Sequence, residues 1–263
     1  METLTKLGGI LLMLFIIIFA VFQFLKHSGK RKYSKALFEK RVIEERTSEI
    51  PLEGNILAAA YILTYSTTFS TPSIDYYMVY LLKWFADGRT ELKDSLIAFT
   101  DLPAPKDNDE KAYYMVFRKA CQEDQVIHEE DDVKRAFYNN TRQLYSPTAL
   151  HENGRVWFAK RGYVEKEKVI VPQLNEAGAA EARRVISLRN YLTDIASGQT
   201  TIRGDDPHMK EYVAYAYLFE IGQRFIDALY KVLPEYIQIY TEKAGILAKA
   251  AADGRYDAED TDD

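Results

Sequence analysis

Residues 7–25 read LGGILLMLFIIIFAVFQFL, a stretch without a charged residue in which Gln23 is the only polar side chain. A helix of this length is roughly 28 Å long at about 1.5 Å per residue, which is close to the hydrocarbon thickness of a bilayer. The stretch therefore predicts a transmembrane helix over 7–25, preceded by a short extracytoplasmic terminus over 1–6. A cleaved secretory signal is the alternative, but it needs a basic start and a small-residue cleavage site, and the sequence has neither.

Basic residues follow this stretch at once, whereas Glu2 and Lys6 before it cancel. An excess of Lys and Arg marks the cytoplasmic end of a membrane span. The sequence thus predicts a cell-membrane protein that crosses the bilayer once, with Met1 outside and the rest of the chain in the cytoplasm after a basic juxtamembrane segment over 26–49. The alternative role of this segment is to hold anionic lipid headgroups. Its membrane-flanking basic residues are Lys26, Lys30, Arg31, Lys32 and Lys35.

The composition of the 263-residue chain is that of a folded, water-facing protein, with 47% hydrophobic, 28% charged and 13% aromatic residues. These values exclude both a disordered chain and a polytopic transporter. The formal net charge of −5 argues against general binding to nucleic acid, because phosphate contacts need clustered Lys and Arg. A single Cys excludes an internal disulfide and a thiolate metal cage.

Two stretches after the basic segment share an order of helices followed by a turn and strands. In a first unit over 50–102, Asp87-Gly88 ends a helix and the next residues alternate as a strand does. In a second unit over 108–172, Asn153-Gly154 is a type I′ hairpin signal. Its strands are expected over 155–160 and 163–171. Helices followed by a hairpin are the order of a winged helix, so the sequence predicts two winged-helix-like units in tandem.

The last third of the chain, over 175–252, is predicted to be helical. Asn175 caps a first helix that Ser197-Gly198 ends, and a long helix then runs as far as Pro234. A final helix gives way to an acidic tail over 253–263, which is expected to be disordered. The predicted fold class is therefore mainly α (α+β), with one N-terminal transmembrane helix and a mostly helical cytoplasmic body that carries winged-helix-like β-hairpins.

The common catalytic templates are absent from the sequence, which has no Gly-rich phosphate loop, no H-E-x-x-H and no G-x-S-x-G. His128 precedes the acidic run 129–132, but the close ligand spacings of zinc sites are missing, so a solvated helix start is the favoured interpretation. Cys121 falls on the apolar face of its helix and is expected to pack as a small hydrophobe. The sequence predicts no catalytic, cofactor-binding or metal-binding residue, and no enzyme.

Tyrosine is abundant, with 19 residues, and it clusters early and late in the chain. Tyrosine is favoured where one end of a side chain is dry and the other wet, as at protein interfaces. Core packing accounts for most of these residues. A tyrosine-lined groove for a partner is the second interpretation, formed by Tyr76, Tyr77, Tyr80, Tyr212, Tyr215 and Tyr217.

The run YLLKWFADGRTEL over 80–92, after Ile50-Pro51 and an Ala-rich helix, resembles the cytoplasmic region of the YciQ-like family of predicted bacterial membrane proteins. The helix pair over 181–194 and 211–222 is similar to that family as well. The resemblance covers about residues 50 to 240, implies a membrane protein with this helix order, and supplies no site residues, because the family's function is not established. The chain departs from the family in its short stretch before the predicted span and its lack of a second one.

The leading functional hypothesis is a membrane protein whose acidic cytoplasmic domain docks other proteins as a scaffold or adaptor. The alternative is a membrane-tethered winged-helix regulator that binds DNA. The basic residues around the second predicted wing support this alternative. These residues are Arg155, Lys160, Arg161, Lys166 and Lys168. The expected partners are the lipid bilayer and one or more unidentified proteins; the acidic charge disfavours nucleic acid, and the oligomeric state stays open.

Overall fold

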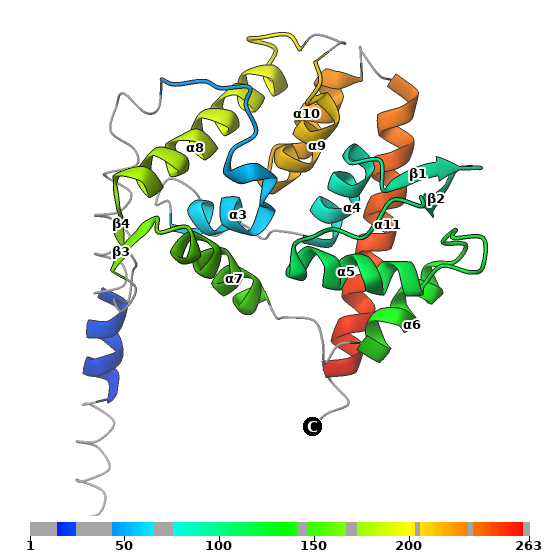
Figure 1. Cartoon of the computed structure of the whole chain (residues 1–263), viewed down its shortest axis with the longest axis horizontal. Coiled ribbons are helices and arrows are strands. Elements are labelled where there is room, and N and C mark those ends of the chain that lie inside the picture. The colour runs from blue at the N-terminus through cyan, green and yellow to red at the C-terminus, as the bar shows by residue number, and fades with distance from the viewer. Residues whose placement is uncertain are drawn as a thin grey trace, which may run out of the picture.

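Helices make up most of the structure, a computed structural model that describes residues 15–24, 44–65, 76–140, 147–166, 173–202, 206–230 and 234–259 (Figure 1). The helices after residue 44 are the 3-10 helix η1 (Leu52–Gly54) and the α-helices α3 (Ile56–Tyr65), α4 (Tyr76–Ala86), α5 (Asn108–Lys119), α6 (Glu130–Asn140), α7 (Pro147–Lys160), α8 (Glu176–Ala196), α9 (Met209–Leu218), α10 (Gly222–Leu229) and α11 (Pro234–Glu259). The strands β1 (Thr90–Lys93) and β2 (Leu96–Phe99) form one antiparallel pair, and β3 (Val164–Lys166) and β4 (Gln173–Leu174) form another. The prediction of a mainly helical protein is confirmed.

The predicted transmembrane helix over 7–25 is contradicted by the structure. Residues 15–24 form an exposed helix, and the rest of that stretch lies outside the described residues. A membrane-spanning helix needs about 20 apolar residues. Among the described residues, none of the helices combines the length and the apolar character that a membrane crossing requires. The predictions of a single-pass topology and of a location in the cell membrane are therefore wrong. The predicted membrane-flanking basic residues, Lys26, Lys30, Arg31, Lys32 and Lys35, lie outside the described residues.

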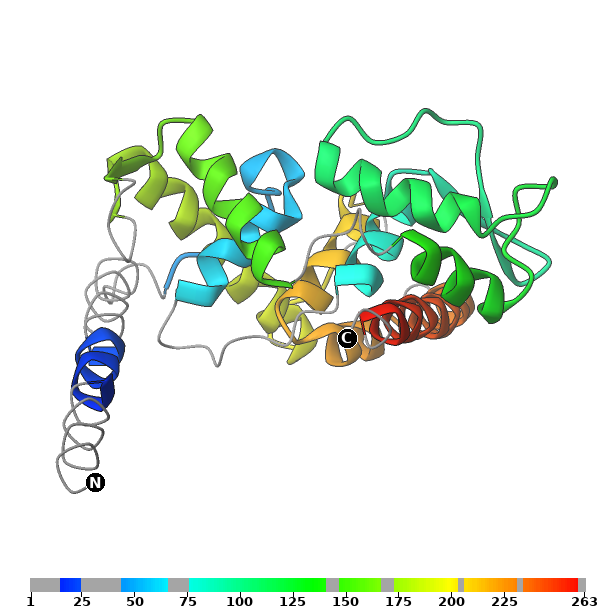
Figure 2. The same cartoon turned by 90° about the horizontal axis from the view of Figure 1, so that it is seen from below.

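Two groups of helices meet at α9 (Figure 2). In one group α3 packs against α7 and contacts α8; in the other α6 lies along α11, and α11 also packs against α4. Helix α9 packs against α4 and contacts α3, α8 and α10, so it joins the two groups into one hydrophobic core. Trp84 is fully buried in the second group, with ring centroids 5.2 Å from Tyr114 and 5.7 Å from Phe117.

The junction between α4 and β1 forms as the sequence predicts. Gly88 adopts a φ of +72°, a conformation that glycine reaches without strain. Its N–H donates to the carbonyl of Phe85, and the N–H of Arg89 donates to Trp84, which together close the end of the helix. The hairpin β1–β2 then returns to this point, where the N–H of Thr100 donates to the carbonyl of Arg89 at 3.0 Å.

The junction between α7 and β3 repeats this arrangement. Gly162 has a φ of +69°, and its N–H donates to Ala159 while the N–H of Tyr163 donates to Phe158. After the β3–β4 pair, the N–H of Asn175 donates to the carbonyl of Tyr163 at 3.0 Å, as Thr100 does to Arg89. The chain therefore contains two helix–hairpin units with the same backbone hydrogen bonds.

The second hairpin does not lie where the sequence predicts it. Asn153 and Gly154 fall inside α7, so the predicted turn and the strand over 155–160 are wrong, and the strands of this unit are β3 and β4. A Cβ on Gly154 would lie 2.3 Å from the carbonyl oxygen of Leu57 and 2.8 Å from the Cβ of Tyr61. Glycine therefore serves here to let α7 approach α3 closely, and the expectation of two winged-helix-like units is not met.

The last third is helical as predicted, with different boundaries. The long helix expected to reach Pro234 is interrupted at Glu220, which has a φ of +60°, and the N–H of Ile221 donates back to Ala216 to end α9. Helix α11 begins at Pro234 and continues through Glu259, so residues 253–259 of the predicted disordered tail are helical.

Candidate functional site

The two predicted tyrosine clusters do meet, because α4 and α9 pack against each other. Four of the six residues are buried, however: Tyr77, Tyr80, Tyr212 and Tyr215 have exposed fractions of 8% or less, whereas Tyr76 and Tyr217 are half-buried. The ring of Tyr80 stacks on Tyr113 with centroids 5.5 Å apart, and the Tyr212 hydroxyl donates to the carbonyl of Ser48 at 2.7 Å. These rings hold helices together in the core and do not line an open groove.

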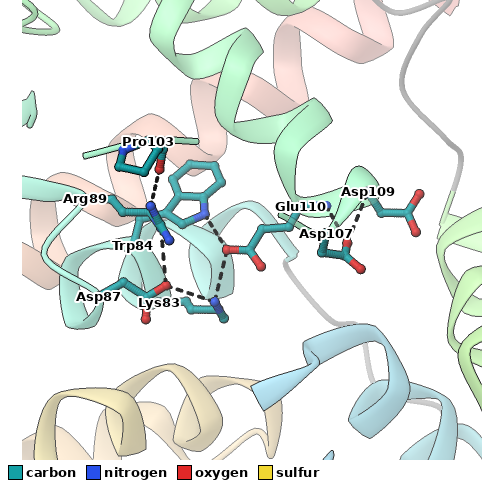
Figure 3. A network of polar contacts seen from close by, with 8 residues as sticks. All are labelled: Lys83, Trp84, Asp87, Arg89, Pro103, Asp107, Asp109 and Glu110. Carbon is teal, nitrogen blue, oxygen red and sulfur yellow. Dashed lines mark hydrogen bonds and ion pairs between the residues drawn. The ribbon is translucent and has the colours of Figure 1, made fainter. Parts of the chain in front are cut away.

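A network of ionic groups, in which Glu110 is buried, Lys83 and Arg89 are half-buried and Asp87 is exposed, joins the end of α4 to the start of α5 (Figure 3). The Oε1 atom of Glu110, a residue only 8% exposed, accepts hydrogen bonds from Lys83 Nζ and Trp84 Nε1, both at 3.0 Å. Lys83 Nζ also lies 3.0 Å from Asp87 Oδ2, and Arg89 Nε lies 3.6 Å from the same carboxylate oxygen. Arg89 in addition donates to the carbonyl of Pro103. Lys83 is thus held between two carboxylates.

The N-terminus of α5 is fixed by its own cap beside this network. Asp107 accepts hydrogen bonds from the N–H groups of Asp109 and Glu110, both at 3.0 Å. A capping carboxylate satisfies backbone donors that the helix leaves unpaired. The cap and the ion pairs together determine where α5 starts relative to α4.

The acid–base properties of the network favour a structural role. Burial raises the pKa of Glu110, and Lys83 together with the Trp84 hydrogen bond opposes this increase. Burial lowers the pKa of Lys83, but Glu110 and Asp87 outweigh it and the net pKa is raised. The charges therefore neutralise one another, and in the described ranges we find no group of three or more His, Cys, Asp or Glu residues arranged to hold a metal ion.

Sequence reasoning missed this network. Lys83 and Glu110 are 27 positions apart, on different helices, and neither stands in a motif. The only local signal is the Asp107 cap, which marks a helix start without indicating a partner across the fold.

A polar hollow of about 310 Å³ lies between the C-terminal end of α5 and one side of α6, from Asp132 to Asn140. Lys119 Nζ donates to Asn140 Oδ1 at 2.7 Å, and Arg135 pairs with Asp132 at 3.0 Å. Cys121 also lines this hollow, but burial raises the pKa of its thiol to about 12, so the nucleophilic thiolate is scarce at neutral pH. Cys121 follows the end of α5 instead of lying within the helix, but it is partly buried against the core, so the prediction that it packs as a small hydrophobe is confirmed.

A second, smaller opening has an apolar floor and a charged rim; we call it the α6–α11 groove. Its lining residues are Leu96, Ile97, Ile127, His128, Glu129, Glu130, Lys243, Ile246 and Leu247. The groove has a volume of about 60 Å³, which is roughly two water volumes. It can thus take the methyl end of one aliphatic side chain and has no room for a cofactor.

Three separate segments hold the groove in place. Strand β2 supplies Leu96 and Ile97, and the N–H of Ile127 donates to the carbonyl of Ile97 at 3.0 Å, which attaches the loop before α6 to the sheet. Ile97, Ile127 and Leu247 are 1%, 3% and 7% exposed and form the floor. Ile246 on α11 is 39% exposed at the rim, so an apolar side chain remains in contact with solvent beside the opening.

His128, which the sequence analysis considered as a metal ligand, lies on the rim of this groove. Its Nε2 atom is 2.9 Å from Asp124 Oδ2, and this hydrogen bond is the main reason why the pKa of Asp124 is lowered. Glu129 and Glu130 are exposed beside it and make no ion pair within the described part of the chain. The acidic run is the solvated start of α6, as predicted, and its first two residues, Glu129 and Glu130, also line the apolar opening.

The basic residues considered for DNA binding are partly neutralised. Arg155 pairs with Glu152, and Arg161 pairs with Glu53 while its guanidinium lies 4.1 Å from the centroid of the Trp157 ring. Lys160 is exposed at the end of α7, whereas the side chains of Lys166 and Lys168 lie outside the described residues. Two of the three basic side chains that the structure describes are thus already engaged in ion pairs within the protein.

Comparison of the chain with protein-family models, with curated proteins and with solved structures found no match. The resemblance to the YciQ-like family stays a prediction.

Proposed function

We propose that this protein is a docking module that binds a partner protein at the α6–α11 groove. The observation that carries the proposal is the combination of a buried apolar floor with a partly exposed apolar side chain, Ile246, at the rim. Protein interfaces are typically built around such an apolar centre with a polar edge. A single side chain of a partner, inserted between β2 and α11, would cover both the apolar floor and Ile246.

The position of the groove supports this function. Helix α11 lies along α6 and also contacts β2, so the two walls of the groove belong to elements that are packed on the same core. A preformed site loses little conformational entropy when a partner binds, and binding there needs no rearrangement of the helices.

Site-specific photo-crosslinking tests the proposal. A photoreactive amino acid replaces Ile246 in one variant and Met115 in the other; Met115 is 40% exposed on α5 and does not line the groove. Both variants are produced in full-length form in the native host and irradiated in intact cells. We expect a discrete crosslinked product with one other protein from position 246 only.

The crosslinked products distinguish a partner protein from a second copy of this chain. A crosslink from position 246 that joins two copies of this chain would replace the partner by a homodimer. Products of equal intensity from positions 246 and 115, or no product from either, would overturn the proposed docking site.

A further inference from the structure

We infer that the segment docked in the α6–α11 groove is a short basic stretch carrying one aliphatic side chain, an inference that rests on the proposed docking function. The apolar floor favours an aliphatic side chain, and the volume of about 60 Å³ admits the end of only one. The charges around the opening determine what must flank it.

The rim is acidic on the side of α6. Glu129 and Glu130 are both exposed and make no ion pair among the described residues. The other titratable groups that line the groove are His128, which is engaged with Asp124, and the half-buried Lys243 on α11. Two carboxylates and a single lysine thus line the opening, so cationic groups that flank an inserted side chain meet more attraction than repulsion.

The charge of the rim also disfavours an acidic occupant. An acidic segment would bring further carboxylates to Glu129 and Glu130, and like charges placed together across an interface oppose binding. A neutral segment would bury part of this rim without compensating its charge. Because both carboxylates remain partly in water, each contact contributes modestly and is weakened by salt.

Fluorescence anisotropy of labelled peptides, titrated with the full-length protein, tests the inference. The probe is the peptide KRKLKRK, and the matched controls are KRKSKRK, which lacks the aliphatic anchor, and EDELEDE, which keeps the anchor and reverses the charge. We expect saturable binding of the probe, weaker binding of the serine peptide and no binding of the acidic peptide. Raising the salt concentration should weaken probe binding.

Variants of the protein identify the surface used. The double variant Glu129→Gln/Glu130→Gln should bind the probe about tenfold more weakly, which corresponds to two exposed charge contacts. Ile246→Glu should also weaken binding, whereas Met115→Glu should leave it unchanged. Unchanged melting temperatures and circular dichroism spectra show that the variants are folded.

Probe binding that is insensitive to both the Glu129/Glu130 and the Ile246 variants would overturn the inference, as would equal binding of KRKSKRK. If the probe does not bind while position 246 still crosslinks to a partner, the basic character is wrong and the docking function stands. If neither is observed, both fail.

Discussion

Replacing Gly154 with alanine tests the packing of α7 against α3. In an ordinary helix this change stabilises by about 1 kcal/mol, because alanine has the higher helix propensity. At this position the added Cβ would lie 2.3 Å from the backbone oxygen of Leu57, and backbone atoms cannot move aside without shifting α3. Overpacking of this kind costs about 1–3 kcal/mol, and the backbone contact places Gly154 at the upper end. We therefore expect Gly154→Ala to lower the free energy of unfolding by about 2 kcal/mol, the difference between the two effects.

The matched control is Gly245→Ala, where an added Cβ would meet no atom within 4 Å. This position is also inside a helix, so the same substitution should raise stability by up to about 1 kcal/mol. Chemical denaturation of both variants gives the two free energies, and their melting temperatures should shift in opposite directions. If Gly154→Ala is as stable as Gly245→Ala, then α7 does not approach α3 in the way that the structure shows.

Three further predictions concern the buried groups. Glu110→Ala leaves Lys83 with Asp87 alone and Trp84 Nε1 without its acceptor, so it should lower the free energy of unfolding in urea by about 2–3 kcal/mol. Glu110→Gln keeps an acceptor oxygen and should lower it by about 1 kcal/mol. Equal losses for the two variants would contradict the ionic role of Glu110. Cys121, whose pKa is raised from 9.0 to about 12, should react with iodoacetamide at pH 7.5 roughly a thousandfold more slowly than a thiol of ordinary pKa, and rapid labelling of the native protein would refute the burial of this thiol. The folded state binds the Cys121 proton more tightly than the unfolded state does, so the stabilisation by the protonated thiol is complete below pH 9.0 and is lost as the pH rises towards 12. Between pH 9.0 and 12 the free energy of unfolding of Cys121→Ala should therefore fall less steeply with pH than that of the native protein.

Local signals predicted the local features of the fold. Asp87-Gly88 marked the end of α4 and the start of a strand, and both lie where expected because the turn is made by hydrogen bonds among neighbouring residues. Asn175 caps α8 through the N–H of Gly178 at 3.0 Å, and Gly198 with a φ of +74° follows the end of that helix. These features depend on residues within one helical turn, which the sequence displays directly.

The sequence-based predictions were wrong where contacts between residues far apart in the sequence determine the local structure. Asn153-Gly154 is a strong hairpin signal in isolation, but in the folded chain its glycine is required by the close approach of Leu57, which lies far away in the sequence. A better signal for the second hairpin was present in the repeated letters Trp-Phe-Ala at 84–86 and 157–159, each followed within three residues by a glycine. In both copies that glycine has a positive φ and leads into a strand.

The groove could not be predicted from the sequence as a whole, although one of its parts was noticed. His128 and the acids after it attracted attention as a group of titratable residues, whereas Leu96 and Ile246 come from segments that show nothing unusual. Only the pairing of β2 with the loop at Ile127, and the packing of α11 along α6, bring these residues together.

A reversal of charge on both binding partners tests the central claim most directly. The variant Glu129→Lys/Glu130→Lys is titrated with KRKLKRK and with EDELEDE, and the native protein serves as the reference. We predict that the variant no longer binds the basic peptide and binds the acidic one instead, with the leucine required in both complexes. If the variant binds KRKLKRK as tightly as the native protein does, the acidic rim of the α6–α11 groove takes no part in recognition, and the account is contradicted.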